Sequence, residues 1–150
     1  MGAYQTIMVG TDGSDSSYKA VDKAAGLARD AGAKLVIVCA YHPAGEREVA
    51  AAEDALRDEA YQVVGSAPAE DTLRTAADRA AAAGATDVLT DAVSGDPVKT
   101  LVRCVEQHRA DLLVVGNRGL NTLAGRILGS VPSDVSRQAH CDVLIVHTVR

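Results

Sequence analysis

The chain alternates between short apolar runs and longer stretches in which apolar residues recur at every third or fourth position. A short apolar run between turn-forming residues is typical of a buried strand, and the longer spacing is typical of a helix. The strand pattern occurs at residues 4–10, 34–40, 86–93, 112–115 and 142–147. The helical pattern occurs at residues 20–31, 50–64, 69–83, 97–105 and 131–139. In the first strand, Ile7 and Val9 are expected on one face and Met8 on the other.

Strands that alternate with helices predict βαβ units and a doubly wound, five-stranded parallel sheet with helices on both faces. We therefore expect a single α/β domain over residues 1–150. Two strand orders are common for such a sheet, 2-1-3-4-5 and 3-2-1-4-5, and we predict the second. That order makes the first and fourth strands neighbours and reverses between them. Ligands of these sheets bind at the reversal, beyond the carboxyl ends of the strands.

Composition and charge narrow the class of protein. With 47% hydrophobic residues and neither Trp nor Phe, the core must be built from Val, Leu, Ile and Ala. The formal net charge of -5 argues against a nucleic-acid partner, which needs a basic face. The chain shows no signal-peptide pattern and no apolar run long enough to span a bilayer, so we expect a cytoplasmic protein with no membrane partner. The scattered Cys39, Cys104 and Cys141 are expected to be reduced, buried thiols.

The most informative stretch is residues 111–131, DLLVVGNRGLNTLAGRILGSV. A strand pattern breaks there into glycines at 116, 119, 125 and 129, and Ser130 then leads into a helical pattern. A glycine-rich loop that leads into a helix N-terminus is a common way to bind phosphate, because glycine lets the backbone approach a ligand closely. In the predicted order this loop faces Gly10, Thr11 and Asp12 across the crevice.

Two familiar phosphate motifs are excluded. A Walker loop needs a Gly-Lys pair followed by Ser or Thr, and the chain has no Gly-Lys pair. A dinucleotide fingerprint needs G-x-G-x-x-G after the first strand, and Gly10 and Gly13 do not form it.

The spacing Gly116-x2-Gly119-x9-Gly129-Ser130 resembles the nucleotide-binding pattern of the ATP-binding branch of the universal stress proteins. The likeness covers the whole chain, because VGTDGS at 9–14, Ala40 and SGDP at 94–97 also look like the family's motifs. The phrases DLLVVGN, GRILGSVPSDVSRQA and DVLIVHT look especially like small mycobacterial members that bind cyclic AMP as well as ATP. The resemblance implies a Rossmann-like adenine nucleotide-binding fold, with cAMP or ATP as the bound ligand.

The resemblance also implies which residues contact the nucleotide. Gly10, Thr11 and Asp12 would line the adenine and ribose side, while Ala40 and Val93 would meet the adenine edge through their backbones. The residues implied to bind ribose and phosphate are Gly116, Asn117, Arg118, Gly119, Gly129, Ser130 and Val131. No metal site is implied, except that Asp12 could hold Mg²⁺ through a bound nucleotide.

Several of these side chains have a simpler structural interpretation. Asp12 is as well suited to cap the first helix as to contact a ligand, and Ser14 or Asp15 could also be that cap. Ser130 could be a helix cap as well as a ligand. Arg126 fits a surface ion pair better than a phosphate contact. The histidines have no metal-ligand spacing and are interpreted as structural or surface residues, as is Tyr41.

The function implied is nucleotide binding, as a sensor or sink in a stress response. We expect no enzymatic activity, because Asp12 is the one carboxylate placed at the predicted site and no base or nucleophile accompanies it. Two alternatives stay open: slow ATP hydrolysis, and a dimeric interaction module with a vestigial pocket. The expected partner is a second copy, because strand 142–147 would lie at a sheet edge and pairing would cover its apolar residues. The resemblance implies the same homodimer.

Overall fold

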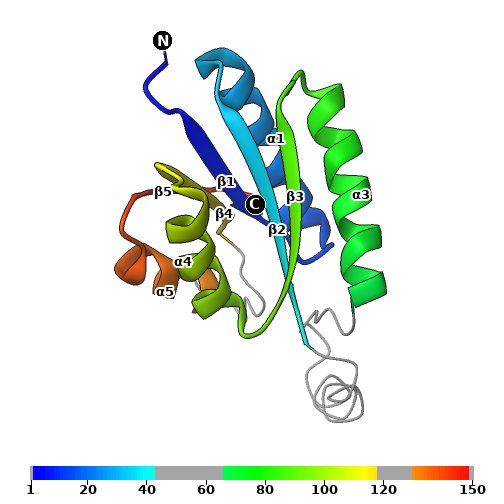
Figure 1. Ribbon diagram of the computed structural model, residues 1–150, viewed down its shortest axis with the longest axis vertical. Coiled ribbons are helices and arrows are strands. Elements are labelled where there is room, and N and C mark those ends of the chain that lie inside the picture. The colour runs from blue at the N-terminus through cyan, green and yellow to red at the C-terminus, as the bar shows by residue number, and fades with distance from the viewer. Residues whose placement is uncertain (1, 43–65, 118–129, 149–150) are drawn as a thin grey trace.

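The computed structural model describes residues 2–42, 66–117 and 130–148 (Figure 1). The helix predicted at 50–64 and the predicted ligand residues Arg118, Gly119 and Gly129 lie outside the described residues, as does Arg126. In chain order the elements are β1 (Thr6–Gly10), α1 (Asp15–Ala31), β2 (Lys34–Tyr41), α3 (Ser66–Ala82), β3 (Val88–Ser94), α4 (Pro97–His108), β4 (Leu112–Gly116), α5 (Ser130–Gln138) and β5 (Asp142–Val146).

The strands form one parallel sheet in the order β3-β2-β1-β4-β5, which confirms the predicted order. β1 and β4 are neighbours at its centre, with Ile7 opposite Leu112. From β1 the chain builds β2 and β3 on one side and then returns to build β4 and β5 on the other. The switch point therefore lies between β1 and β4, whose carboxyl ends, Gly10 and Gly116, open on the same edge of the sheet.

Helices cover both faces of the sheet (Figure 1). Ile7 and Val9 are fully buried in a core shared with α1 and α3, whereas Met8 is fully buried in a second core shared with α4 and α5. Successive strand side chains point to opposite faces, so this placement confirms the predicted faces of β1. α1 lies close to the sheet because small residues such as Ala20 and Ala24 form its buried side.

Turn chemistry sets where the helices begin and end. Ser14 is the N-cap of α1, since its backbone is extended and its Oγ accepts the N–H of Ser17 at 3.2 Å. The interpretation of Asp12 as this cap is wrong, because its Oδ1 accepts the N–H of Ser14, before the helix begins. Gly32 ends α1 in the left-handed conformation, with φ of 65°. Asp96 caps α4, as its position before a proline predicts.

Most element boundaries differ from the predicted ones by one to three residues. α3 begins at Ser66 rather than at 69, because Pro68 fits the first turn of a helix, where its missing N–H has no intrahelical partner. β3 begins at Val88 and β5 ends at Val146. In the described parts of the chain, no helix combines the length and apolar character needed to cross a membrane.

Candidate functional site

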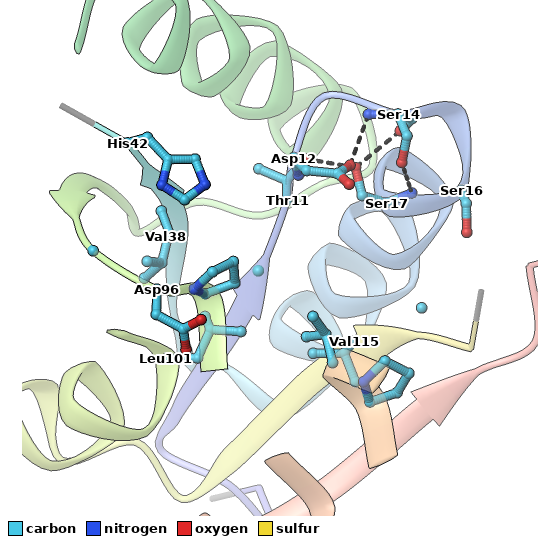
Figure 2. A pocket seen from close by; sticks show the side chains of 17 residues that line it. Thr11, Asp12, Ser14, Ser16, Ser17, Val38, His42, Asp96, Leu101 and Val115 are labelled. Carbon is cyan, nitrogen blue, oxygen red and sulfur yellow. Dashed lines mark hydrogen bonds between the residues drawn. The ribbon is translucent and has the colours of Figure 1, made fainter. Parts of the chain in front are cut away.

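A cavity of about 270 Å³ opens at the edge of the sheet where β1, β2 and β4 end (Figure 2). It lies at the switch point between β1 and β4, which is where doubly wound sheets bind their ligands. The described part of its wall comes from these strand ends and from the first turns of α1, α4 and α5. The wall residues are Gly10, Thr11, Asp12, Ser14, Ser16, Ser17, Val38, Ala40, His42, Gly95, Asp96, Pro97, Leu101, Val115, Gly116, Val131 and Pro132.

The inner wall of the cavity is apolar. Val38, Leu101 and Val115 are buried beside it, at 0%, 5% and 4% exposure, and Ala40 continues the wall from β2. Removing apolar surface from water is favourable, so an apolar slot of this kind suits a flat, uncharged ring. Ala40 has a small side chain, which leaves the end of β2 accessible.

A second part of the wall carries hydroxyl groups and one carboxylate from the turn after β1. Oγ1 of Thr11 lies 2.8 Å from Oγ of Ser17, and the N–H of Gly13 donates to Oγ1 of Thr11 at 3.2 Å. Oδ1 of Asp12 accepts the N–H of Ser14 at 2.9 Å. Figure 2 shows the hydrogen bonds that join Thr11 and Asp12 to Ser14 and Ser17 at the start of α1. The bonds hold the carboxylate of Asp12 at the cavity.

The charged side chains of the described wall are mostly acidic. Asp12 and Asp96 contribute carboxylates, and no Lys or Arg is among the described residues that line the cavity. Oδ2 of Asp96 accepts the N–H of Lys99 at 3.1 Å, so this carboxylate is engaged as a helix cap. The N-termini of α1, α4 and α5 all lie at the wall, and each contributes positive potential there.

Cys39 lies beside this wall but is not a nucleophile at neutral pH. Its side chain is fully buried, and burial, with a smaller contribution from the nearby charge of Asp12, raises the pKa of the thiol to about 12. The thiolate is the reactive form, so at neutral pH Cys39 acts as a small apolar core residue. This agrees with its interpretation from the sequence.

The structure brings together half of the predicted ligand residues. Those that line the cavity are Gly10, Thr11, Asp12, Ala40, Gly116 and Val131. Val93 is not among the wall residues, because its side chain packs against the core on the α4–α5 face. Ser130 begins α5, next to the wall, but its side chain lies outside what the structure describes. Tyr41, also absent from the wall, is partly buried against the α1–α3 core.

Asn117 is also predicted as a ligand residue, but its side chain bonds elsewhere. It is 9% exposed and does not line the cavity. Its Oδ1 accepts two hydrogen bonds from Thr148, from the backbone N–H at 2.8 Å and from Oγ1 at 3.0 Å. A nucleotide contact through this amide would have to replace those bonds.

Several residues that line the cavity were not predicted as site residues from the sequence pattern. The pattern alone places His42 among surface residues, whereas it lies at the cavity with its ring near Val38 (Figure 2). Its position just past the end of β2 could have identified it as a site residue, since residues beyond the carboxyl ends of parallel strands lie close together. Ser16 and Leu101 lie inside helices, and no local pattern separates them from other helical residues.

The universal stress protein family model matches residues 3–147 of the chain. A universal stress protein of Mycobacterium tuberculosis H37Rv is 55% identical over 148 residues, which cover 99% of each chain. The crystal structure of a universal stress protein in complex with cAMP has a TM-score of 0.76 and 49% identity, over 99% of this chain and 100% of that one. The universal stress protein UspA from Lactobacillus plantarum has a TM-score of 0.76 and 27% identity, over 97% and 99% of the two chains.

Proposed function

This chain belongs to the universal stress protein family, and we propose that it binds an adenine nucleotide, with cAMP as the first candidate, in the cavity at the ends of β1 and β4. The observation that carries the proposal is the pairing of an apolar slot with a polar wall at the switch point of the sheet. Val38, Ala40 and Leu101 offer apolar surface for the base. Thr11 and Asp12 offer hydrogen-bonding groups for the sugar.

The carboxylates of the described wall and a similar solved structure support cAMP as the first candidate. A cyclic phosphate carries one negative charge, whereas a triphosphate carries several and needs cations or a metal ion beside it. In the described wall, the N-terminus of α5 can bind a phosphate. The carboxylates of Asp12 and Asp96, elsewhere in this wall, would repel further phosphate groups. The similar universal stress protein solved with cAMP supports the same ligand.

ATP remains the second candidate for the same site, with Mg²⁺ between its phosphates and Asp12. In the described parts of the chain, no group of three or more His, Cys, Asp or Glu side chains could hold a metal ion. A Mg²⁺ here would take oxygen ligands from the nucleotide and from one carboxylate. ATP binding through this arrangement should therefore weaken when Mg²⁺ is removed.

Calorimetric titration of the purified protein with cAMP, cGMP and ATP tests the proposal, the last with and without Mg²⁺. We expect cAMP to bind more tightly than ATP, and the titration with cGMP measures whether the slot distinguishes adenine from guanine. Tighter, Mg²⁺-dependent binding of ATP would place the chain with the ATP-binding members of its family. No heat with any nucleotide, confirmed by equilibrium dialysis, would contradict the proposal and favour a dimeric interaction module with a vestigial pocket.

We propose a binding role, as a nucleotide sensor or sink in a stress response, rather than a catalytic one. The described wall carries a second carboxylate, Asp96, and His42 besides the expected Asp12. Both carboxylates accept backbone N–H bonds at the starts of α1 and α4, and Cys39 is a protonated thiol. Slow ATP hydrolysis is tested by following phosphate release from ATP with wild type and Asp12→Ala. Hydrolysis that this substitution abolishes while nucleotide binding survives would favour the enzyme.

The proposed partner is a second copy of the chain, paired through residues 142–147. β5 is an edge strand of the described sheet, and Val143, Leu144 and Ile145 are each only partly buried. The carbonyl of Val146 accepts the N–H of Asn117 at 2.8 Å and so points into the sheet. The main-chain groups of the preceding Ile145 then point outward, which is the arrangement that strand pairing requires.

A further inference from the structure

We infer that Asn117 is a positioning residue, which joins Thr148 and Ser16 in a hydrogen-bonded clamp that holds Gly116 and the first turn of α1 at the wall of the nucleotide cavity. The inference rests on the proposed function, because it concerns how that site is held. It gives Asn117 a role other than the direct ligand contact implied by its position in the glycine motif. The clamp consists of Ser16, Asn117 and Thr148.

Asn117 extends the pairing of β4 with β5 beyond the ends of both strands. Its backbone N–H donates to the carbonyl of Val146 at 2.8 Å, as the next rung of the ladder would. Its Oδ1 then accepts the N–H of Thr148 at 2.8 Å. Its Nδ2 lies 3.2 Å from Nδ1 of His147. One side chain thus binds two successive residues after β5.

Thr148 links Asn117 to α1 through hydrogen bonds. Its Oγ1 donates to Oδ1 of Asn117 at 3.0 Å and also lies within hydrogen-bond distance of Oγ of Ser16. A hydroxyl has one hydrogen, so if Thr148 gives its hydrogen to Asn117, Ser16 must be the donor to Thr148. Nζ of Lys19 donates to the carbonyl of Thr148 at 3.3 Å, which adds a second link to α1.

Ser16 is the residue of the clamp that lines the cavity, and Gly116, which directly precedes Asn117, also lines it. Ser16, Asn117 and Thr148 are 6%, 9% and 6% exposed, so their polar groups depend on one another rather than on water. The Ser16 hydrogen points toward Thr148 in this bonding pattern. Ser16 therefore offers acceptor lone pairs to the cavity, which suits a sugar hydroxyl better than a phosphate oxygen.

A double-mutant cycle on cAMP affinity tests whether Asn117 acts through Thr148 or contacts the nucleotide itself. The proteins are wild type, Asn117→Ala, Thr148→Val and the double variant, and Thr148 does not line the cavity. Thr148→Val keeps the shape of the side chain and removes its hydroxyl. We expect each single variant to bind cAMP roughly three- to tenfold more weakly, as the loss of a buried hydrogen bond suggests, and the double variant to bind no more weakly than Asn117→Ala.

Thr148→Ser restores the hydroxyl and should restore most of the affinity lost in Thr148→Val. Thr72→Val is the matched control, since Thr72 is another buried threonine, on α3, and does not line the cavity. Melting temperatures of all variants separate a loss of folding from a loss of affinity. If Asn117→Ala does not fold, the inference is tested by comparing the cAMP affinities of Thr148→Val and Thr148→Ser.

Wild-type affinity in Thr148→Val would overturn the inference, and so would additive losses in the double variant, because they would make Asn117 a direct ligand. A lower melting temperature with unchanged affinity would reduce the clamp to a structural role and would also overturn it. If wild type itself binds no nucleotide, the proposed function fails together with the clamp. If wild type binds and Thr148→Val binds equally well, the clamp alone fails.

Discussion

A β-carbon added at Gly116 would lie 3.2 Å from Oγ of Ser16. The same atom would lie 3.4 Å from Cγ2 of Thr148, so it would meet two of the three residues of the clamp. The end of β4 thus approaches the first turn of α1 more closely than a residue with a side chain would allow without displacing its neighbours. The glycine is needed here for its missing side chain.

Gly116→Ala should weaken cAMP binding by about tenfold or more while the protein stays folded, because Ser16 and the wall of the cavity must shift to make room. Calorimetric titration measures the loss. Gly26→Ala is the matched control, since a β-carbon on Gly26 in α1 would meet only a guanidinium nitrogen of Arg29, at 3.9 Å. The control should bind normally and gain about 0.5–1 kcal/mol in free energy of unfolding. Normal binding by Gly116→Ala would contradict the assigned wall.

Ile145→Lys should convert the proposed dimer into a monomer. A lysine on the edge strand β5 would bring two positive charges together across the twofold axis and place them in an apolar contact. Sedimentation velocity gives the oligomeric state directly. Leu89→Lys, on the opposite edge strand β3 where Leu89 is 39% exposed, should leave the dimer intact. A dimeric Ile145→Lys protein that melts like wild type would exclude this interface.

Asp111→Ala should lower the free energy of unfolding by about 1–2 kcal/mol. The carboxylate of Asp111, just before β4, accepts the N–H of Gln5 at 2.9 Å and the N–H of Thr6 at 3.0 Å, and so ties the start of β1 to β4. Urea unfolding measures the change. Asp30→Ala should change the free energy by less than about 0.5 kcal/mol, because the side chain is 68% exposed and its ion pair among the described residues is with exposed Arg29. Equal effects of the two variants would contradict this account.

Cys39 should make the protein less stable in alkali. Burial, followed by the charge of Asp12, raises the pKa of its thiol from 9.0 to about 12. Below about pH 8 the thiol is almost wholly neutral in both the folded and the unfolded chain, so it adds no pH dependence there. Between these two pKa values only the unfolded chain forms the thiolate, and the free energy of unfolding should fall by about 1.4 kcal/mol per pH unit from this group.

Cys39→Ala should be less stable than wild type at neutral pH but should lose less stability as the pH rises from about 8 to about 10.5, since it lacks this titration. Urea unfolding at several pH values gives both slopes. Comparing the two proteins removes the shared contribution of Tyr and Lys residues that titrate in the same range. Parallel curves for wild type and Cys39→Ala would show that Cys39 is not the source of the alkaline loss.

Local sequence patterns determined the architecture of this protein. The two-residue alternation in β1 placed Ile7 and Val9 on one face and Met8 on the other, because each strand side chain has only two directions to take. Asp96 before Pro97 marked the start of α4, because capping depends on a few adjacent residues. The strand order then located the cavity, since parallel strands that reverse their winding leave a crevice between them.

Only the tertiary structure decided which side chains meet in that crevice. His42, Ser16 and Leu101 come from a strand end and two helices, and their convergence depends on the register and packing of elements that are far apart in the chain. Asn117 stands within the glycine motif, yet the register of β4 against β5 brings it to Thr148, 31 positions later. No local period encodes such a contact, because it exists only once both strands have paired.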